Sequence, residues 1–310
     1  MTTALAPCVS IPAPVDLVGA FLAGRSPQTL RAYRQDLEAF RAFTGSATPE
    51  DAAAGVLGAG QGGANALALA WRASMVDAGL APATVNRRLA ALRSMVKLAR
   101  VVGMVPWTLD VDGVKAATYR DTRGPGLDAV RSMLAVVNGR TGPKATRDRA
   151  LVRVLFDLAL RRGEAVALDV AHVDVAAGTV SVLGKGRTAR EPLTLPLPAR
   201  EALRAWLDVR GVEPGPLFTS MHRGCAGARM TGDGVGDVLA ELGTAAGVKG
   251  PVRPHGLRHT AITHALDVTH GDVRKVARFS RHRDVRTLSI YDDNRQDMGG
   301  QVAALVAMAV

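Results

Sequence analysis

Hydrophobic side chains recur at helical spacing through the first hundred residues of the chain. Ser26-Pro27 is a typical helix start, with a capping serine and a proline at the first helical position. A second helix is expected to open at Pro49-Glu50-Asp51, and a third near Pro82. The apolar stripes of the first and third helices are Leu30, Tyr33, Leu37 and Phe40, and Val85, Leu89, Leu92 and Val96.

The pattern then changes and divides the chain into further segments. Prolines, glycines and aspartates interrupt any periodicity over 105–124, which indicates a linker between a compact helical domain at 15–104 and a second domain at 125–295. Residues 1–14 are expected to form an irregular lead-in, and residues 296–310 an apolar tail. A chain of 310 residues is long enough for two domains with separate cores.

The second domain mixes helical spacing with a short stretch of alternation. Helices are predicted over Leu127–Val137 and Ala145–Leu160. Alternation over Thr179–Val182, a Gly184-Lys185-Gly186 turn and a returning strand over Glu191–Leu195 predict a hairpin with a lysine at its tip. Helical patterns continue after the hairpin to the end of the chain, so the predicted fold class is mainly α with a small antiparallel β-sheet.

The charge of the chain favours a nucleic-acid partner. The formal net charge is +11, the isoelectric point is near 10.5, and arginine far outnumbers lysine. The guanidinium fork binds phosphate in a bidentate manner, which suits a DNA or RNA backbone. The alternative is a GC-rich genome, which raises arginine, alanine and glycine together. No run of apolar residues is long enough to span a bilayer, and the start lacks a basic signal-peptide region, so a cytoplasmic protein without membrane contact is expected.

The third predicted helix carries a nearly all-positive set of polar positions. Such a face suits a DNA backbone, although a solvated charged face is the ordinary interpretation. These candidate DNA-binding residues are Arg87, Arg88, Arg93, Lys97 and, at the helix end, Arg100.

Two candidate groups lie in the first half of the second domain. Arg161 follows an apolar run and precedes Glu164 by three residues, so the carboxylate can hold the guanidinium in place. The alternative is a surface ion pair that contributes little. Lys185 at the hairpin tip can reach a ligand, or it can simply be a solvated lysine.

The last quarter of the chain holds a further set of candidates. Pro254 favours a helix start, which places His255 and Arg258 on one face near a partly positive helix N-terminus. His255 and His259 also have zinc-site spacing, but Gly256 stands where a zinc-protease helix has its glutamate, and Cys8 and Cys225 are too few for a cysteine site, so no metal is expected.

Two residues complete the set, and one motif is discounted. His282 lies in a basic turn between two helical segments, and Tyr291 follows nine residues later. By itself Tyr291 could be the edge of a packed helix. The glycine-rich run Gly232–Gly236 has no preceding strand and is expected to be a loop before a helix at Val238, not a nucleotide site.

Together, these residues resemble the tyrosine recombinase family of the phage-integrase and Xer type. Arg161 with its neighbours is similar to the first arginine box, and Lys185 to the lysine of the β-hairpin. His255-Gly256-Leu257-Arg258 matches the His-x-x-Arg box, and the spacing from His282 to Tyr291 matches that of the second histidine and the nucleophile. The resemblance covers nearly the whole chain, because residues 15–104 resemble a core-binding, SAM-like helical domain and residues 125–295 the catalytic domain.

This resemblance implies a site-specific recombinase that forms a 3′-phosphotyrosine intermediate. Tyr291 would attack the scissile phosphate, Arg161 and Arg258 would hold its oxygens, and Lys185 would protonate the leaving 5′-oxygen. His255 would assist proton transfer at the tyrosine, His282 would donate a hydrogen bond to the phosphate, and Glu164 would orient Arg161. No metal or other cofactor is implied.

The implied partners are two double-stranded DNA sites held by a homo-tetramer. A monomer or a dimer is expected away from DNA, accessory DNA-bending proteins are a further class of partner, and the protein would associate with the nucleoid. The apolar tail with Val302, Leu305, Val306 and Met308 would dock on a neighbouring protomer or pack on its own domain.

The chain also departs from the family pattern. Ser280-Arg281-His282 stands where the family usually has Leu-Gly-His, and Asp292-Asp293 follows Tyr291 where Thr-His often stands. These departures favour a divergent integrase of a mobile element over the housekeeping Xer branch. The alternatives are a type IB topoisomerase-like DNA-relaxing enzyme and a non-catalytic DNA-binding protein on a recombinase fold.

Overall fold

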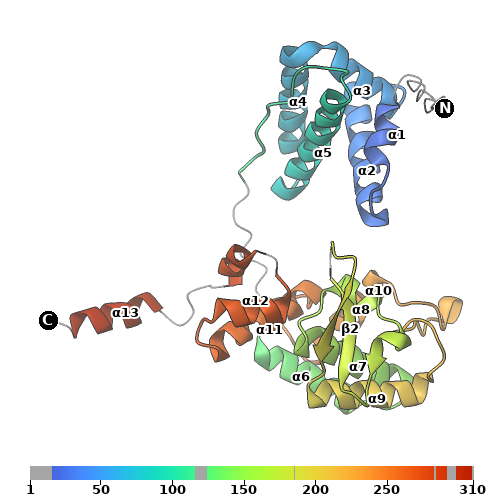
Figure 1. Ribbon diagram of the computed structural model, residues 1–310, viewed down its shortest axis with the longest axis vertical. Helices are drawn as coiled ribbons and strands as arrows, with labels where there is room; N and C mark the ends of the chain where they lie inside the picture. Colours follow the sequence, from blue (N-terminus) through green and yellow to red (C-terminus); the bar gives the residue numbers. More distant parts are fainter. Residues whose placement is uncertain (1–15, 116–123, 185, 283, 292–297, 309–310) are drawn as a thin grey trace, which may run out of the picture. The chain divides into compact units, whose positions relative to one another are not determined.

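The computed structural model describes residues 16–115, 124–184, 186–282, 284–291 and 298–308. The chain separates into two compact units, Met1–Tyr119 and Arg120–Val310, which are described one at a time (Figure 1). The division falls within the segment expected as a linker. No described helix is long and apolar enough to cross a membrane.

The N-terminal unit is a bundle of helices whose starts follow the expected capping signals. Ser26 accepts a hydrogen bond from the Thr29 N–H, and Thr48 forms a capping box with Asp51, so the predicted helix starts at Ser26-Pro27 and Pro49 are confirmed. The start at Pro82 is confirmed as well. The helices are α1 (Leu17–Leu22), α2 (Pro27–Thr44), α3 (Pro49–Gly58), α4 (Gly60–Asp77) and α5 (Pro82–Val101).

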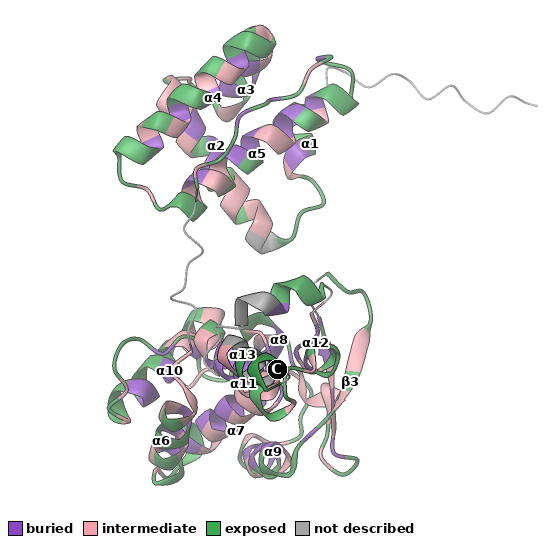
Figure 2. Ribbon diagram, turned by 90° about the vertical axis from the view of Figure 1, so that its left-hand side faces the viewer, coloured by how far each residue is buried: buried purple, intermediate pink, exposed green. Residues whose placement is uncertain are grey.

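The core of this unit is closed partly by residues that follow the last helix. Phe40 packs edge-on against Trp71 with ring centroids 4.8 Å apart, among buried residues of α1, α2, α4 and α5 (Figure 2). Val105, Leu109 and Val111 are buried in the same core. The first half of the expected linker therefore packs on the helical unit, because its spaced apolar side chains bury surface that α4 and α5 leave uncovered.

The second unit combines helices with one small sheet, as the predicted fold class requires. Its first elements are α6 (Leu127–Asn138), α7 (Pro143–Asp157), α8 (Arg162–Val166), η2 (Val170–His172), β1 (Val173–Asp174), β2 (Thr179–Leu183) and β3 (Arg190–Thr194). The remaining elements are α9 (Leu197–Arg210), η3 (Arg223–Cys225), α10 (Gly232–Ala245), α11 (Pro254–Val268), α12 (Val273–Ser280), η4 (Val285–Tyr291) and α13 (Met298–Ala307).

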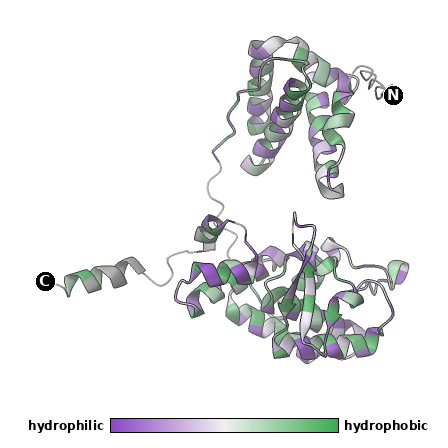
Figure 3. Ribbon diagram, viewed as in Figure 1, coloured by the Kyte–Doolittle hydropathy of each residue, from purple (hydrophilic) through white to green (hydrophobic). Residues whose placement is uncertain are grey.

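The sheet is antiparallel with strand order β1-β2-β3. Val180 and Val182 of β2 are buried while Thr179 and Ser181 are not, which is the period-two pattern that predicted the hairpin (Figure 3 colours each residue by hydropathy). Leu183 pairs with Arg190 at the last rung before the turn. The predicted hairpin is confirmed, and β1 adds a short third strand.

The glycine-rich run that was expected to be a loop is helical, so that prediction is wrong. Helix α10 begins at Gly232, and the side chain of Thr231 caps it by accepting a hydrogen bond from the Gly234 N–H at 3.1 Å. Val235 is fully buried in the core of the unit. The cap and this burial outweigh the low helix propensity of the glycines.

Two hydrophobic clusters support the second unit. The larger is built around α7 and α9, and Trp206 donates a hydrogen bond from Nε1 to the Leu217 carbonyl at 2.8 Å. The smaller cluster joins Ala159, Ile262, Val276 and Leu288. The smaller cluster lies where α11, α12, η4 and the turn after α7 meet, and these segments carry the candidate residues.

Candidate active site

The turn between α7 and α8 is the point where the candidate groups gather. Helix α7 ends at Asp157, earlier than the predicted Leu160, and Ala159 has a positive φ of 45°. This turn directs the carbonyl oxygens of Leu158 and Ala159 toward two arginines from later in the chain. Arg258 donates to the Ala159 carbonyl, and Arg281 donates to both carbonyls at 3.1 and 3.2 Å.

Arg161 follows this turn and is held by Glu164 as the three-residue spacing indicated. Nη1 of Arg161 donates to Oε1 of Glu164 at 2.7 Å, and the backbone N–H of Arg161 donates to Oε2 at 2.9 Å. The side chain of Glu164 is 3% exposed and that of Arg161 is 31% exposed. The side chain of Arg161 is therefore partly exposed at the surface of the unit, while the buried carboxylate of Glu164 holds it in place.

Glu164 carries a full negative charge at neutral pH. Burial alone would raise the pKa of this carboxyl, but the positive charge of Arg281 and the hydrogen bonds from Arg161 outweigh it and hold the pKa below its ordinary value. Arg281 donates from Nη2 to Oε2 of Glu164 at 2.9 Å, so the carboxylate bridges two cations.

Helix α11 begins at Pro254, as predicted, and supplies His255 and Arg258. Arg258 is 2% exposed, and its Nη2 donates to the Ser280 carbonyl at 2.5 Å. His255 is exposed in the first turn. Partial loss of water around the ring, followed by the nearby charges of Arg258 and Arg161, lowers the pKa of His255 and favours its neutral form.

His282 follows the end of α12 and contacts both Arg258 and Ser280. Its Nε2 lies 3.5 Å from Nη2 of Arg258, and its Nδ1 lies 2.7 Å from Oγ of Ser280. Because the Ser280 hydroxyl donates to the Val276 carbonyl at 2.6 Å, Oγ is available as an acceptor for an N–H at Nδ1. We therefore assign the Nδ1–H tautomer, with the lone pair of Nε2 directed at the arginine.

The charge state of His282 follows from the same surroundings. Burial of the ring, followed by the positive charges of Arg258 and Arg161, lowers the pKa of His282 to about 4. The imidazole is therefore neutral at pH 7 in the free protein. A phosphate placed among these arginines would supply negative charge and raise this pKa.

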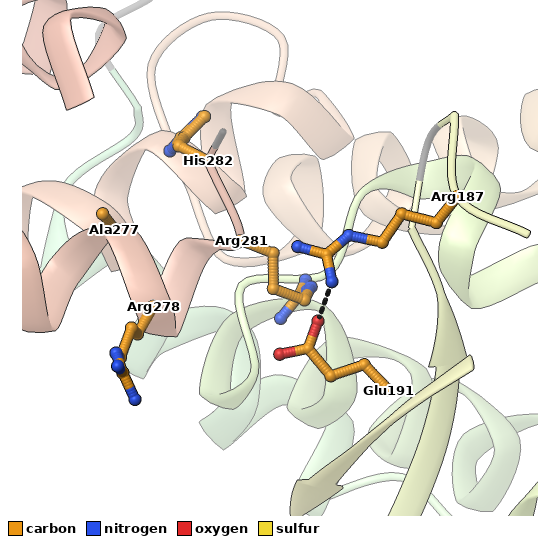
Figure 4. A pocket seen from close by; sticks show the side chains of 6 residues that line it. All are labelled: Arg187, Glu191, Ala277, Arg278, Arg281 and His282. Atoms are coloured by element: carbon orange, nitrogen blue, oxygen red, sulfur yellow. Dashed lines mark hydrogen bonds and ion pairs between the residues drawn. The ribbon is translucent and has the colours of Figure 1, made fainter. Parts of the chain in front are cut away.

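Lys185 lies outside the described residues, between the two strands of the β2–β3 hairpin. The β2–β3 hairpin on either side is described, and Arg187 and Glu191 form an ion pair at 2.8 Å across its end. These two residues and the end of α12 line a pocket of about 290 Å³ (Figure 4). Arg278, Arg281 and His282 form the other side of this pocket, so the hairpin approaches the candidate site.

Tyr291 is the last residue of η4, and its side chain is outside the described part of the structure. The helix that carries it is anchored by Leu288, which is 1% exposed in the smaller hydrophobic cluster. Val285 at the start of the same helix is exposed. Packing of Leu288 thus holds η4, which carries the candidate nucleophile, against α11, which carries Arg258, and α12, whose end precedes His282.

Two residues in the described site were not assigned a role from the sequence. Arg281 and Ser280 stand at the departure from the usual Leu-Gly-His pattern, and both bind candidate residues directly. The departure itself was the available signal, but their partners lie too far away in the chain to be read from spacing.

The proposed DNA-binding face of α5 is partly occupied by bonds within the helical unit. Arg87 donates to the buried carboxylate of Asp36 at 2.5 Å, and Arg88 lies 3.9 Å from the same carboxylate. Arg93 donates to the Val111 carbonyl at 3.2 Å, while Lys97 is exposed. Arg87, Arg88 and Arg93 therefore contribute to packing, which the pattern of charges did not indicate.

The histidines with zinc-site spacing are not brought together as ligands. His259 is buried, and its Nδ1 lies 3.3 Å from the Thr263 hydroxyl. In the described part of the chain, no group of three or more histidine, cysteine, aspartate or glutamate side chains could hold a metal ion.

The chain joins a helical unit to a mixed domain with clustered arginines and histidines, and the proteins that it matches are DNA breaking and rejoining enzymes. The chain belongs to the phage integrase family, whose model matches residues 127–298, while the N-terminal SAM-like domain model of phage integrases matches residues 21–101. The resemblance derived from the motifs is thereby confirmed. The family consists of tyrosine recombinases, which are site-specific enzymes, and neither the topoisomerase nor the non-catalytic alternative gains support.

Curated relatives agree with this membership over most of their length. A tyrosine recombinase of Synechocystis sp. is 37% identical over 91% of this chain and 91% of its own. A tyrosine recombinase of Synechococcus elongatus is 40% identical over 89% and 88%, respectively. The tyrosine recombinase XerC of Salmonella typhi is 30% identical over 86% of this chain and 85% of its own.

Solved structures share the fold at low identity. The integrase of the Tn1549 transposon, in complex with transposon right-end DNA, is 16% identical with a TM-score of 0.64, covering 94% of this chain and 99% of that chain. A lambda integrase dimer bound to a core site is 13% identical with a TM-score of 0.65, covering 90% and 95%. The fold class of helices with a small antiparallel sheet is thus confirmed.

Proposed function

We propose that this recombinase cleaves DNA with Tyr291 as the nucleophile and a set of five helpers, Arg161, Lys185, His255, Arg258 and His282. The phenolic oxygen of Tyr291 forms a bond to the scissile phosphorus as the bond from phosphorus to the 5′-oxygen breaks. The product is a 3′-phosphotyrosine with a free 5′-hydroxyl. Attack of a 5′-hydroxyl on that linkage releases the tyrosine and joins the strands.

The two arginines are proposed to stabilise the charge that develops on the non-bridging oxygens. Arg258 is nearly fully buried and Arg161 is held against Glu164, so neither cation needs to reorganise when a phosphate arrives. Burial also limits the screening of Arg258 by water. Arg161 follows the turn after α7, Arg258 binds a carbonyl of that turn, and His282 contacts Arg258; this clustering is the observation that carries the proposal.

The proton transfers are assigned to the remaining groups. His255, held in its neutral form, takes the proton of Tyr291, and Lys185 at the hairpin tip gives a proton to the leaving 5′-oxygen. His282 donates a hydrogen bond to the phosphate once the phosphate has raised its pKa, because its Nε2 carries a lone pair in the free protein.

Covalent capture on DNA of the source organism tests this chemistry, because the protein itself selects its site from a genomic mixture. Genomic fragments are incubated with the protein, denatured, and recovered through the attached chain. Wild type is expected to retain strands whose 3′-end is blocked by the attached chain, while the strands released on denaturation carry a 5′-hydroxyl that a kinase labels directly. Tyr291→Phe is expected to bind DNA equally and to retain none covalently; equal capture by this variant would refute the assignment.

The residues that contact the DNA backbone are proposed to include the basic positions of α5, with the exposed Lys97 and Arg100 as the two most available to a phosphate. Arg87, Arg88 and Arg93 would reach DNA only as far as their bonds to Asp36 and Val111 allow. We further propose that the domains run over 15–104 and 125–295, with flanking segments at 1–14 and 296–310. The segment 105–124 that joins the two domains is proposed as the linker, although its first half packs on the helical unit.

The assembly on DNA is proposed to be a homo-tetramer on two paired sites, with a monomer or dimer away from DNA and accessory DNA-bending proteins as further partners. The named lambda integrase structure is a dimer on a core site, which supports assembly on DNA. Val306 of α13 and Met308, which follows the helix, are exposed apolar side chains, which suits docking on a neighbouring protomer or on its own domain. The setting is proposed to be the cytoplasmic nucleoid.

A further inference from the structure

We infer that Arg281 is a positioning residue that fixes Glu164, and through it Arg161, for the reaction under Proposed function, on which this inference rests. The resemblance expects a glycine at this position, and the side chain that replaces it is 2% exposed. The hydrogen bonds of Arg281 go to the carboxylate and to the turn after α7, and its positive charge also contributes to lowering the pKa of His282.

The backbone explains why this position usually takes glycine. Arg281 caps α12 in the left-handed conformation with φ of 58°, and the next N–H, that of His282, donates to the Ala277 carbonyl at 3.1 Å. This closure points the chain from α12 into the site. Arginine adopts the left-handed region much less readily than glycine, so the contacts of its side chain must offset the strain.

Those contacts join the end of α12 to the segment that carries Arg161. The guanidinium of Arg281 donates to Glu164 at 2.9 Å and to the carbonyls of Leu158 and Ala159 at 3.1 and 3.2 Å. It also donates to the Phe279 carbonyl on its own helix at 3.1 Å. One buried cation therefore fixes the turn, the carboxylate and the helix end together.

The charge of Arg281 has a second consequence for Glu164. This carboxylate is buried, and a buried carboxylate stays ionised only when cations and donors surround it. Without Arg281, the carboxylate of Glu164 would keep its ion pair with Arg161 and lose the second positive charge beside it. The pKa of Glu164 would then rise. As the pH falls, protonation of the Glu164 carboxylate would weaken its ion pair with Arg161.

Substitutions at Arg281 distinguish the effect of its left-handed backbone conformation from the effect of its positive charge. Arg281→Gly and Arg281→Asn both tolerate the left-handed conformation and remove the cation, whereas Arg281→Lys keeps a cation that can approach Glu164. We expect the first two to lower the single-turnover cleavage rate on captured site DNA by roughly 10- to 100-fold, with DNA affinity unchanged. Arg281→Lys is expected to recover part of that loss.

Two further readouts distinguish positioning from a purely structural role. The acid limb of the cleavage rate is expected to move to higher pH in Arg281→Gly, because Glu164 becomes easier to protonate. In a double-mutant cycle, Glu164→Gln combined with Arg281→Gly is expected to lose much less than the product of the two single losses. Thermal unfolding of each variant corrects the rates for the folded fraction.

The outcomes are separable from those of the covalent-capture experiment. If wild type forms no adduct, the reaction proposal fails, and ¹³C titration of the Glu164 carboxyl in wild type and Arg281→Gly still tests the effect of Arg281 on its pKa. Wild-type rates in Arg281→Gly and Arg281→Asn, additive losses in the cycle, or an unmoved Glu164 titration would each overturn the positioning role.

Discussion

At the residue scale, a small set of backbone carbonyls and one carboxylate hold three arginine side chains in the site. The carbonyls after α7 and the carboxylate of Glu164 together bind Arg161, Arg258 and Arg281. Mutual repulsion would separate these guanidinium groups if the acceptors were absent. The site is therefore pre-organised for an anion before any DNA arrives.

The pKa of His282 can be tested directly. We expect its ring protons to titrate with a midpoint near 4 in the free protein, since burial and neighbouring arginines oppose the charged form. Between that value and the ordinary pKa, the unfolded chain binds the proton and the folded chain does not, so this histidine lowers stability as the pH falls.

NMR of ¹³C-labelled histidine, with His282→Gln to assign the signal, provides the measurement. Addition of inorganic phosphate should move the midpoint upward, because the anion offsets the repulsion by Arg258. A midpoint near that of a free histidine in the ligand-free protein would contradict the described environment.

At the element scale, the charged residues of α5 divide into packing and binding positions. Arg87→Ala removes a hydrogen-bonded partner from the buried Asp36 carboxylate, so we expect the helical unit to lose roughly 1–3 kcal/mol of unfolding free energy. Lys97→Ala removes an exposed charge and should leave stability unchanged.

DNA affinity is expected to separate the same two variants in the opposite direction to stability, with the larger effect in Lys97→Ala. Lys97→Ala is expected to reduce the salt dependence of DNA affinity by about one counterion. Chemical denaturation and a salt series of binding isotherms measure the two effects. If Lys97→Ala leaves the salt slope intact, this lysine makes no phosphate contact.

Among the side chains of η4 whose burial is described, Leu288 is the buried one, and it anchors the helix. Leu288→Ala should create a cavity in the smaller hydrophobic cluster and cost about 2–4 kcal/mol of unfolding free energy. Because η4 carries Tyr291, we also expect slower covalent capture with unchanged DNA affinity. Val285→Ala on the same helix is the matched control, since Val285 is exposed and its truncation should change neither quantity.

At the scale of the whole molecule, each unit has its own core. Among the described residues, the cluster around Phe40 and Trp71 shares no member with the clusters around Trp206 and Ile262. We therefore expect fragments 16–115 and 124–310 to fold separately, each with a cooperative thermal transition followed by circular dichroism. Failure of either fragment to fold would show that its core requires the other unit.

The covalent connection between the units should matter for DNA affinity. In the proposal, α5 of the first unit and the candidate active site of the second unit both contact DNA, so the intact chain is expected to bind its captured site more tightly than an equimolar mixture of the two fragments. Competition binding at fixed salt measures the ratio. Equal affinity of mixture and intact chain would show that only one unit contacts DNA.

The local features of this protein were determined by the sequence itself. Helix starts at Ser26-Pro27, Pro49 and Pro254, the β2–β3 hairpin and the pairing of Arg161 with Glu164 all depend on residues within a few positions of each other. Caps, period-two alternation and three-residue spacing act over that range, which is why they could be predicted.

The tertiary structure decided what those groups touch. Arg281 binds Glu164 and Arg258 binds Ala159 across separations of 117 and 99 residues, and no periodicity encodes such contacts. The arginines of α5 were assigned to DNA by their charge, whereas the buried Asp36 on another helix holds Arg87. Burial determines how strongly a charged group interacts and which partner it binds, and burial exists only once the chain has folded.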